Sequence, residues 1–332
     1  MNATAVRLLL LGDTSATLDE GAKNVANYLT GFLSARHQVL QMHQRSVIRP
    51  TQLWRAIRFR PQVVMSVQGP SAKTIVLLAL LRWLCRNPRT LAIGAQPSTG
   101  RALQWALRWL PPSCLFAQSR RWIERFQPAG ALVKRLPNGV NVTKFRPGAD
   151  PDAVQVLRTE LGLPVGRRVA LHIGPLNRNR NHQLLIRLQQ QGEWQVLMIG
   201  STTAPFVPEV QQALVDAGVI VARRYFADIS TVYALADAYV FPVLDPHGSI
   251  EFPLTVLEAM ACDRPVVSTR FLALPEYLDE GTALSYFDGS IEGLRAALGR
   301  VQGQSGNRAR AEEFAWERVV ALVESEFQSK DN

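Results

Sequence analysis

The chain has 332 residues, of which 47% are hydrophobic and 19% are charged. This balance is typical of a folded globular protein and excludes a disordered or low-complexity chain. The length is sufficient for two domains of ordinary size, each with its own hydrophobic core.

The net charge of +10 is distributed unevenly along the chain. Residues 1–150 contain 21 Lys and Arg against 5 Asp and Glu, whereas residues 151–332 contain 16 against 22. This asymmetry predicts a polyanionic or membrane-surface partner for the first half alone. The alternative is that the basic residues only keep an apolar half in solution.

Cysteine usage and hydropathy indicate the cellular setting. Cys85, Cys114 and Cys262 form no CxxC pair, which argues against a disulfide framework or a zinc site and fits a reducing compartment. The first apolar run is too short for a signal peptide, and the most apolar later stretch, 74–84, is interrupted by Arg82 and too short to span a bilayer. We expect a cytoplasmic protein that could also bind the inner face of the membrane peripherally.

The first half alternates short apolar runs with amphipathic ones, which predicts βαβ units and a parallel sheet. Strands are expected at 6–11, 38–41, 62–67, 90–93, 114–118 and 132–136. The helices expected between them are 22–35, 50–59, one ending near residue 86, 101–110 and 120–126.

Turn-forming residues and prolines cluster between Pro137 and Pro151, which predicts a domain boundary near residue 150. The second half then repeats the same rhythm. Strands are expected at 168–173, 194–199, 219–222, 238–242 and 265–268, and helices at 182–190, 209–217, 229–236 and 254–261, with further helices to about residue 327. Two doubly wound sheets in tandem imply a cleft in which ligands bind at the carboxyl ends of strands.

The segment 245–265 (DPHGSIEFPLTVLEAMACDRP) is the richest in candidate ligand-binding groups. Glu251 precedes the predicted helix, and Glu258 lies within it. The start of that helix, at Leu254 and Thr255, offers free backbone N–H groups to a phosphate, and the two carboxylates could accept hydrogen bonds from sugar hydroxyls. Alternatively, Glu251 only complements the helix dipole and Glu258 is a surface residue.

A second candidate segment, 174–184 (GPLNRNRNHQL), lies between a predicted strand and a predicted helix. Arg178 and Arg180 place two cations in this turn, an arrangement suited to a diphosphate. Gly174 and Asn177 belong to the same turn and are included in the predicted site. The alternative is two solvated loop arginines.

The remaining candidates carry weaker signals. Gly21 would let the backbone turn tightly after the first strand, but no GxGxxG or P-loop pattern accompanies it. Tyr225 and His247 complete the predicted donor-binding set. The five histidines lack ligand spacing, and the DxD pattern of Asp150 and Asp152 lies in the proline-rich segment, which we interpret as a linker turn. We therefore expect no metal and no other cofactor.

Five segments between Leu136 and Val320 resemble the retaining GT-B glycosyltransferases of family 4. They are 137–148 (PNGVNVTKFRPG), 170–185 (ALHIGPLNRNRNHQLL), 233–242 (YALADAYVFP), 251–269 (EFPLTVLEAMACDRPVVST) and 314–320 (FAWERVV). The resemblance implies an α/β fold of the GT-B kind, with two Rossmann-like domains facing across a cleft. Residues 1–149 would bind the acceptor, residues 150–313 would bind the nucleotide-sugar donor, and a helix at about 314–332 would cross back to the first domain.

The resemblance also implies roles for the basic turn. Arg180 matches the family's lysine that binds the donor diphosphate. The family's arginine falls on Pro175, so Arg178 would take its place. Asp263 and the pair Leu272-Ala273 stand where the family usually has glycines.

The glutamates match the family less evenly. Glu258 matches the glutamate that binds the ribose. The usual place of its partner is Ile250, so either Glu251 substitutes by a shift of one residue or sugar binding is altered. The predicted catalytic residues are Arg178, Arg180 and Glu251.

Together these features predict a metal-independent glycosyltransferase of cell-envelope glycan biosynthesis. It would move a hexosyl group, with retention, from a UDP- or GDP-sugar to a glycan or lipid-linked acceptor. Interleaved Arg and Trp in the helices of the first half suit anionic lipid headgroups, or else form an ordinary packing surface. One alternative is a GT-B scaffold without turnover that binds a polyanion or a membrane surface, nucleic acid being disfavoured because the basic residues lie in apolar helices. Another is a GT-B enzyme of a different reaction, such as an epimerase or a phosphorylase.

Overall fold

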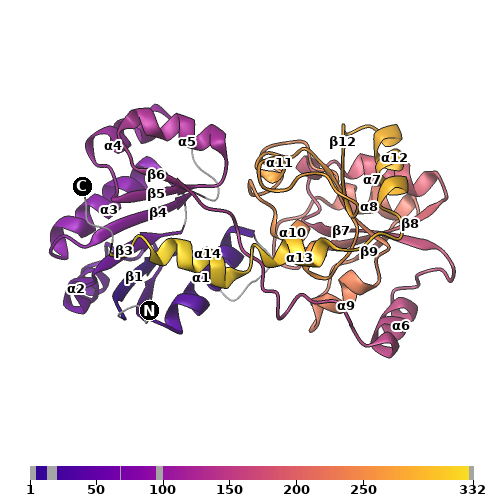
Figure 1. Cartoon of the computed structure of the whole chain (residues 1–332), viewed down its shortest axis with the longest axis horizontal. Coiled ribbons are helices and arrows are strands. Elements are labelled where there is room, and N and C mark those ends of the chain that lie inside the picture. The colour runs from indigo at the N-terminus through magenta and orange to yellow at the C-terminus, as the bar shows by residue number, and fades with distance from the viewer. Residues whose placement is uncertain (1–4, 13–20, 68, 95–99, 329–332) are drawn as a thin grey trace. The chain divides into compact units, whose positions relative to one another are not determined.

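The computed structural model describes residues 5–12, 21–67, 69–94 and 100–328. The chain forms two compact units (Figure 1). The first combines Met1–Asn138 with Trp316–Asn332, and the second is Gly139–Ala315. The segment from residue 139 to residue 150 thus belongs to the second unit, and the division lies earlier than the boundary predicted near residue 150.

The first unit is built on a six-stranded parallel sheet with the order β2-β1-β3-β4-β5-β6. Its strands are β1 (Arg7–Leu11), β2 (Gln38–Met42), β3 (Val63–Ser66), β4 (Arg89–Gly94), β5 (Cys114–Ala117) and β6 (Val133–Arg135). Its helices are α1 (Gly21–Ser34), α2 (Pro50–Phe59), α3 (Ala72–Leu84), α4 (Arg101–Trp109), α5 (Arg120–Phe126), the 3-10 turn η1 (Gln127–Ala129) and α14 (Trp316–Glu324).

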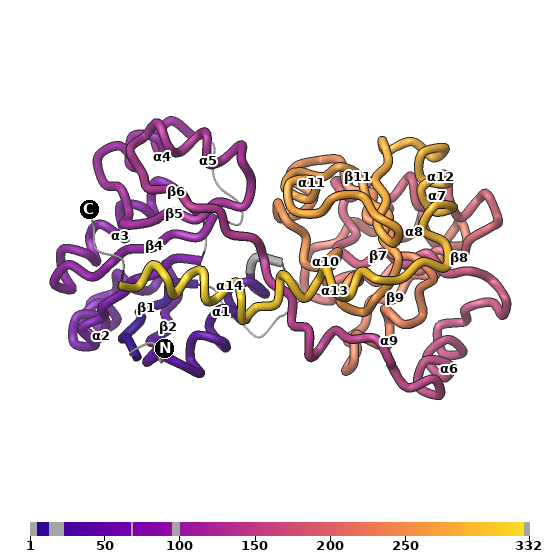
Figure 2. The backbone as a smooth tube through the Cα atoms, viewed as in Figure 1, coloured from indigo at the N-terminus to yellow at the C-terminus, as the bar shows by residue number. Residues whose placement is uncertain are grey.

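The helices of the first unit cover the two faces of its sheet. The chain changes direction after β2, and because parallel crossovers are right-handed, α1 lies on one face while α2 to α5 lie on the other. Leu9, Leu11 and Val64 of the strands are fully buried within a core that α2 to α5 share. Helix α14 packs beside α1, where the rings of Tyr28 and Trp316 stack at 5.4 Å. The end of the chain, yellow in Figure 2, is therefore part of the first unit.

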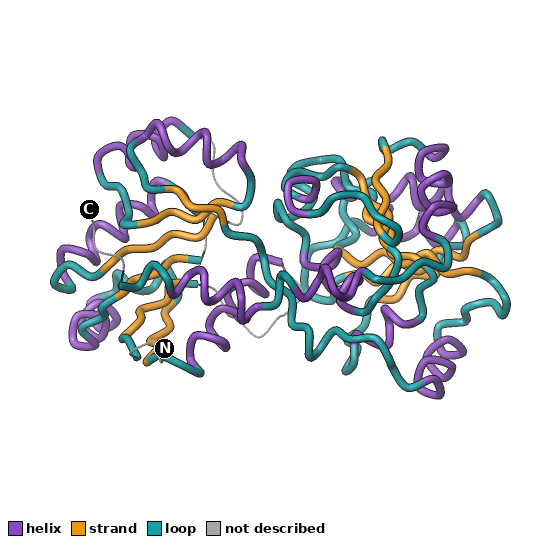
Figure 3. Tube along the Cα trace, viewed as in Figure 1, coloured by secondary structure: helices purple, strands orange, loops and turns teal. Residues whose placement is uncertain are grey.

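The second unit has its own six-stranded parallel sheet, with the order β12-β11-β10-β7-β8-β9. The strands are β7 (Arg168–Gly174), β8 (Trp194–Gly200), β9 (Ile220–Ala222), β10 (Ala238–Phe241), β11 (Val266–Thr269) and β12 (Leu284–Phe287). The helices are α6 (Pro151–Glu160), η2 (Arg178–Arg180, a 3-10 turn), α7 (His182–Gln190), α8 (Pro208–Asp216), α9 (Ile229–Ala234), α10 (Leu254–Ala261), α11 (Leu274–Tyr277), α12 (Ile291–Val301) and α13 (Asn307–Glu312). Figure 3 shows strands layered with helices in both units, which confirms the predicted α/β class.

Two local predictions are wrong. Only helices were expected beyond residue 268, but the buried run Leu284–Phe287 forms the strand β12, which pairs with β11. The DxD segment is not a linker turn but the start of α6. The Asp150 side chain accepts a hydrogen bond from the backbone N–H of Asp152 at 3.1 Å, and Pro151 occupies the first helical position. An aspartate cap followed by proline starts a helix, because the aspartate accepts a hydrogen bond from a free N–H of the first turn and proline, which has no N–H, leaves one fewer donor unpaired.

No helix within the described ranges is long and apolar enough to cross a bilayer. Helix α3 contains the most apolar stretch of the sequence, 74–84, and has 13 residues. It packs on the sheet through a buried side that includes Ile75, Leu78 and Leu81.

Arg308 of α13 fixes the segment that opens the second unit. Its guanidinium donates to the carbonyls of Val142, Phe145 and Ala261 at 3.0, 2.6 and 2.9 Å. Its Nε pairs with Glu312 at 2.7 Å. One side chain thus connects residues 142–145 to the end of α10, which explains why this segment belongs to the second unit.

We predict that Arg308→Ala lowers the free energy of unfolding of the second unit by about 2–4 kcal/mol, because three carbonyls lose a charged donor. Urea unfolding of both variants would measure the difference. The matched control is Arg295→Ala, which removes one exposed ion pair with Glu193 and should cost under about 1 kcal/mol. Equal losses in the two variants would contradict the role of Arg308.

Candidate functional site

The sheet of the second unit reverses its strand order between β7 and β10. The chain runs outward from β7 through β8 and β9, and returns on the other side of β7 as β10. At such a switch point the loops that leave neighbouring strands diverge and form a crevice for a ligand. The two loops here are residues 174–181 and residues 242–253, the segments that the sequence singled out.

The two loops are in direct contact. A Cβ atom on Gly248 would lie 2.3 Å from the Asn179 carbonyl oxygen, so only glycine allows this approach. The Asn181 side chain also donates to the Pro242 carbonyl at 3.1 Å. The turn that carries Arg180 is therefore held against the segment that follows β10.

Arg180 is a buried cation, with only 9% of the residue exposed. Its guanidinium lies against Gly174, where a Cβ atom would come within 2.7 Å of Nη1. No carboxylate within the described ranges pairs with it, and its Nε has no hydrogen-bond partner there. Burial lowers the pKa of Arg180 to about 10, so the side chain is still charged at neutral pH. A buried charge without a counter-ion is costly, and this arrangement is therefore suited to an anionic ligand.

Two neutral histidines lie next to this cation. His172 of β7 is fully buried, and its Nδ1 contacts the Val240 carbonyl at 2.9 Å. Burial and the Arg180 charge hold the pKa of His172 well below its usual value, so the ring is neutral and Nδ1 carries the proton. His182, whose ring centroid is 6.0 Å from that of His172, has its pKa lowered by burial to about 4. The pair fills the space beside Arg180 without adding charge.

The start of α10 belongs to the same edge of the sheet. Its N-cap residue, Pro253, makes no side-chain cap, so the first backbone N–H groups have no intrahelical acceptor. The Tyr239 hydroxyl donates to Thr255 Oγ1 at 2.7 Å. Burial raises the pKa of Tyr239, while the Thr255 hydrogen bond and the Arg180 charge oppose this shift. Arg180 and the N-terminus of α10 thus flank one tyrosine.

Glu258 lies one turn further along α10 and is half-buried. The Tyr233 hydroxyl donates to its Oε2 at 2.7 Å. Burial raises the pKa of Glu258, while the Tyr233 hydrogen bond and the charge of Lys144 oppose this shift. Its other oxygen, Oε1, has no protein donor among the described residues and could accept a hydrogen bond from a ligand.

Glu251 is buried, with 5% of the residue exposed, in the loop between β10 and α10. Its carbonyl accepts a hydrogen bond from the Ala273 N–H at 3.2 Å. The next residue, Phe252, packs its ring on those of Tyr277 and Phe314. Ile250, where the family likeness places a glutamate, is buried to the same degree. The Glu251 loop is therefore fixed on the segment that follows β11.

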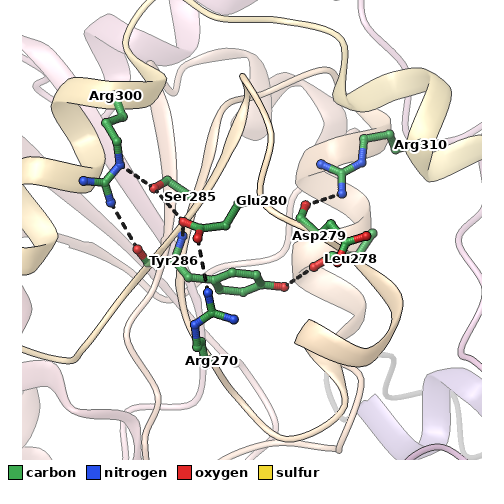
Figure 4. Close-up of polar contacts among 8 residues, drawn as sticks. All are labelled: Arg270, Leu278, Asp279, Glu280, Ser285, Tyr286, Arg300 and Arg310. Atoms are coloured by element: carbon green, nitrogen blue, oxygen red, sulfur yellow. Dashed lines mark hydrogen bonds and ion pairs between the residues drawn. The ribbon is translucent and has the colours of Figure 1, made fainter.

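That segment is itself held by a polar network around Glu280 (Figure 4). Its carboxylate accepts hydrogen bonds from the Tyr286 N–H at 2.8 Å, the Ser285 hydroxyl at 3.3 Å and Arg270 at 3.2 Å. Arg300 donates to Ser285 Oγ at 2.9 Å and to the Tyr286 carbonyl at 3.2 Å. The network joins residues 270–280 to β12 and so stabilises the backbone that supports Glu251.

The other predicted residues lie in varied surroundings. Arg178 is exposed, and Asn177 caps η2 by accepting from the Asn179 N–H at 3.2 Å. His247 is exposed and paired with Asp245 at 3.1 Å, and Tyr225 is exposed after β9. Gly21 is the first residue of α1 in the first unit, and Glu20 before it lies outside the described residues. The contacts described above connect Gly174, Arg180, Thr255 and Glu258, whereas Glu251 lies in the loop that precedes α10 and contacts the segment after β11.

The sequence did not reveal the tyrosines that orient this edge. Tyr233 and Tyr239 lie in the segment YALADAYVFP, where they resemble ordinary core residues, and both are fully buried. Their hydroxyl contacts with Glu258 and Thr255 join positions that are 25 and 16 residues apart, respectively. Within the described ranges, no group of three His, Cys, Asp or Glu side chains could hold a metal ion.

Comparison with known proteins identifies the second unit. Residues 167–302 match the family model of the glycosyl transferases group 1. These residues make up most of the second unit. The matched residues include the whole switch point, from β7 through α10, so Arg180, Glu251 and Glu258 all lie within the matched stretch.

Two curated proteins that the chain resembles are named as transferases. The chain is 29% identical over 182 residues to a D-inositol 3-phosphate glycosyltransferase of Corynebacterium jeikeium, covering 50% of this chain and 42% of that protein. It is 27% identical over 193 residues to a GDP-mannose-dependent alpha-(1-6)-phosphatidylinositol monomannoside mannosyltransferase of Mycolicibacterium smegmatis, covering 54% and 49%. The chain thus spans less than half the length of these two relatives.

Solved structures show that the fold of the whole chain is GT-B. Anabaena HepE in complex with UDP-glucose superimposes with a TM-score of 0.74 at 18% identity, covering 96% of this chain and 99% of that one. The sucrose-phosphate synthase of Thermosynechococcus elongatus gives a TM-score of 0.72 at 14% identity, covering 96% and 98%. The predicted fold class and the family resemblance are confirmed.

We predict that the second unit loses stability in acid through His182. Its folded pKa of about 4 lies below the usual 6.5, so the unfolded chain takes up the proton first. The stabilising contribution is complete above pH 6.5 and is lost as the pH falls toward 4, amounting to roughly 3 kcal/mol. Urea unfolding at several pH values would show a flatter pH dependence for His182→Gln than for the unchanged chain. Identical slopes would be evidence against a neutral buried imidazole.

Proposed function

We propose that the chain is a glycosyltransferase that takes a sugar from a nucleotide-diphosphate sugar bound by its second unit. The observation that carries the proposal is Arg180, a buried cation without a carboxylate partner among the described residues, at the switch point of the stretch that matches the glycosyl transferases group 1. A diphosphate supplies the missing negative charge, and the N-terminus of α10 offers it backbone N–H donors.

Arg180 and the helix N-terminus would bind the leaving diphosphate more strongly as its bond to the sugar breaks. Negative charge grows on the leaving oxygen at that moment, and fixed donors stabilise it without having to reorganise. Arg178, which is exposed on the same turn, would add a second cation. These side chains would neutralise the diphosphate without a metal ion. Retention of the anomeric configuration is proposed from the family likeness, and we assign no side chain as a nucleophile.

The two glutamates would contact the two sugar rings of the donor, the ribose and the transferred hexose. Glu258 Oε1 would accept hydrogen bonds from the ribose hydroxyls, since Tyr233 already uses Oε2. Glu251 would contact the hydroxyls of the transferred hexose. The exposure of Tyr225 and His247 would limit both to contacts at the rim of the site.

The acceptor would bind the first unit and would be a glycan or a lipid-linked glycan. Two facts support this class. The relatives named above include one whose acceptor is a phosphatidylinositol monomannoside, and residues 1–150 of this chain are strongly basic. The enzyme would then act at the cytoplasmic face of the membrane.

A screen of nucleotide-sugars tests the proposal directly. UDP-glucose, GDP-mannose and ADP-glucose would be added to the full chain, thermal stabilisation would be recorded, and release of the nucleotide would then be assayed. We expect one of these nucleotide-sugars to raise the melting temperature of the chain and the same compound to release its nucleotide. Stabilisation without turnover would indicate a binding scaffold, and no stabilisation by any of them would contradict the donor site.

We predict that Arg180→Gln weakens binding of the nucleoside diphosphate by roughly 10- to 100-fold, because a charge-assisted contact with phosphate is lost. Pyrophosphate alone should be affected equally. The matched control is Arg187→Gln, an exposed arginine on α7, which should leave affinity unchanged. Isothermal titration calorimetry would measure the dissociation constants of the unchanged chain and of both variants for the nucleoside diphosphate and for pyrophosphate.

We predict a different pattern for Glu258→Ala. Affinity for the nucleoside diphosphate should fall about tenfold, because the ribose loses a charged acceptor, while affinity for pyrophosphate should not change. Tyr233→Phe is the control, since it removes the hydroxyl that donates to Oε2 and to the Thr255 carbonyl but leaves the Glu258 carboxylate in place. Unchanged nucleotide affinity in Glu258→Ala would exclude this residue from the site.

A further inference from the structure

The first unit contains a long segment without negative charge. Residues 21–123 include 15 Lys and Arg and no Asp or Glu. This segment supplies α2, α3 and α4, which cover one face of the sheet. The outer surface of that layer therefore attracts anions along its full length.

The same layer carries all the exposed tryptophans. Of the seven tryptophans, Trp54, Trp83, Trp105 and Trp109 are 61–79% exposed, and the other three are at most 3% exposed. Trp54 lies on α2, Trp83 on α3, and Trp105 and Trp109 on α4. An exposed indole leaves a large apolar area in water, and four of them in one helical layer indicate a partner with an apolar component.

Helices α3 and α4 each present one continuous stripe. On α3, Val76, Leu80 and Trp83 are exposed at the spacing of one helix face. On α4, Trp105 and Trp109 are separated by one turn, and Arg108 is exposed beside them. The apolar stripes cannot be explained by packing within the chain, because these helices already bury their opposite sides in the core.

A hollow of about 550 Å³ lies between the carboxyl-terminal ends of α3 and α4. Trp83 and Trp109 line it together with Leu78 and Pro112, and Arg86 is also part of its wall. Its lining thus combines indole rings, aliphatic carbon and a guanidinium. A phospholipid headgroup with the first part of its acyl chains has the matching sequence of anionic and apolar groups.

We propose that the α3–α4 surface binds an anionic phospholipid bilayer. This surface is defined as Val76, Leu80, Trp83, Arg86, Trp105, Arg108 and Trp109. The tryptophans lie at the boundary between headgroups and acyl chains, the arginines contact phosphates, and the hollow accepts one headgroup. The complementarity of charge selects anionic lipid, and the aliphatic stripe of α3 distinguishes a bilayer from nucleic acid, which would offer Val76 and Leu80 nothing to bury them. The inference does not depend on the proposed transferase activity.

Vesicle sedimentation of the full chain, without nucleotide-sugar, tests the proposal. We expect the chain to pellet with phosphatidylcholine–phosphatidylglycerol vesicles, to pellet weakly with phosphatidylcholine alone, and to dissociate at high salt. Tryptophan fluorescence should shift to shorter wavelength on binding, because the indoles leave water.

Two double variants separate the charged and apolar parts. Arg86→Gln with Arg108→Gln should weaken binding about 30-fold, since each basic residue near an anionic surface contributes about a fivefold factor. Trp83→Ala with Trp109→Ala should weaken binding similarly and remove most of the fluorescence shift. All four side chains are exposed, so the melting temperature should not change.

The matched control changes the opposite face of the same sheet. Arg318→Gln with Leu322→Ala alters one exposed cation and one exposed aliphatic residue of α14, and vesicle binding should be unaffected. Three results would overturn the proposal. In the first, all three double variants bind vesicles equally well. In the second, the chain binds an oligonucleotide and not vesicles. In the third, the chain binds no vesicles and forms a dimer that the Trp83 and Trp109 substitutions dissociate.

Discussion

The second unit is organised around one unpaired charge. Arg180 is buried beside Gly174, and a cation in that position would ordinarily need a carboxylate. The surrounding residues instead accommodate the charge without neutralising it. Two histidines stay unprotonated next to it, Gly248 lets the loop after β10 approach the arginine turn, and Tyr239 connects this edge to α10. The fold thereby preserves a positive centre that no carboxylate of the described residues neutralises.

The first unit uses positive charge in a different way. Its basic residues are spread over an outer helical layer rather than buried at one point, and they alternate with exposed indole rings. A concentrated buried charge is suited to a small anion bound in one orientation, whereas a dispersed one is suited to an extended surface. The second unit therefore concentrates positive charge at one buried arginine, whereas the first unit spreads it over a helical surface, although each unit is built on a six-stranded parallel sheet.

Much of this could be predicted from the sequence, because apolar runs between turn formers locate parallel strands reliably. The start of α6 was missed because proline and aspartate signal a turn as readily as a helix start. The residue pattern alone could not show which of Arg178 and Arg180 is the buried cation. The two residues lie in the same turn, and it is the fold that buries Arg180 and leaves Arg178 exposed. Two of the residues that stand where the family usually has glycine also adopt the left-handed backbone conformation that glycine favours. Asp263 and Leu272 keep the left-handed conformation, with φ of 53° and 39°, and Asp263 uses its carboxylate to accept hydrogen bonds from the N–H groups of residues 306 and 308.

The return of α14 to the first unit has a consequence for how the protein is made. Trp316 stacks on Tyr28, and Glu324 accepts hydrogen bonds from Arg36 and contacts His37 at 3.0 Å. These partners are separated by nearly the entire chain, so a ribosome must synthesise the second unit before the first can complete its core. The amino-terminal unit therefore leaves the side of α1 that contacts α14 exposed to solvent until the second unit has been synthesised.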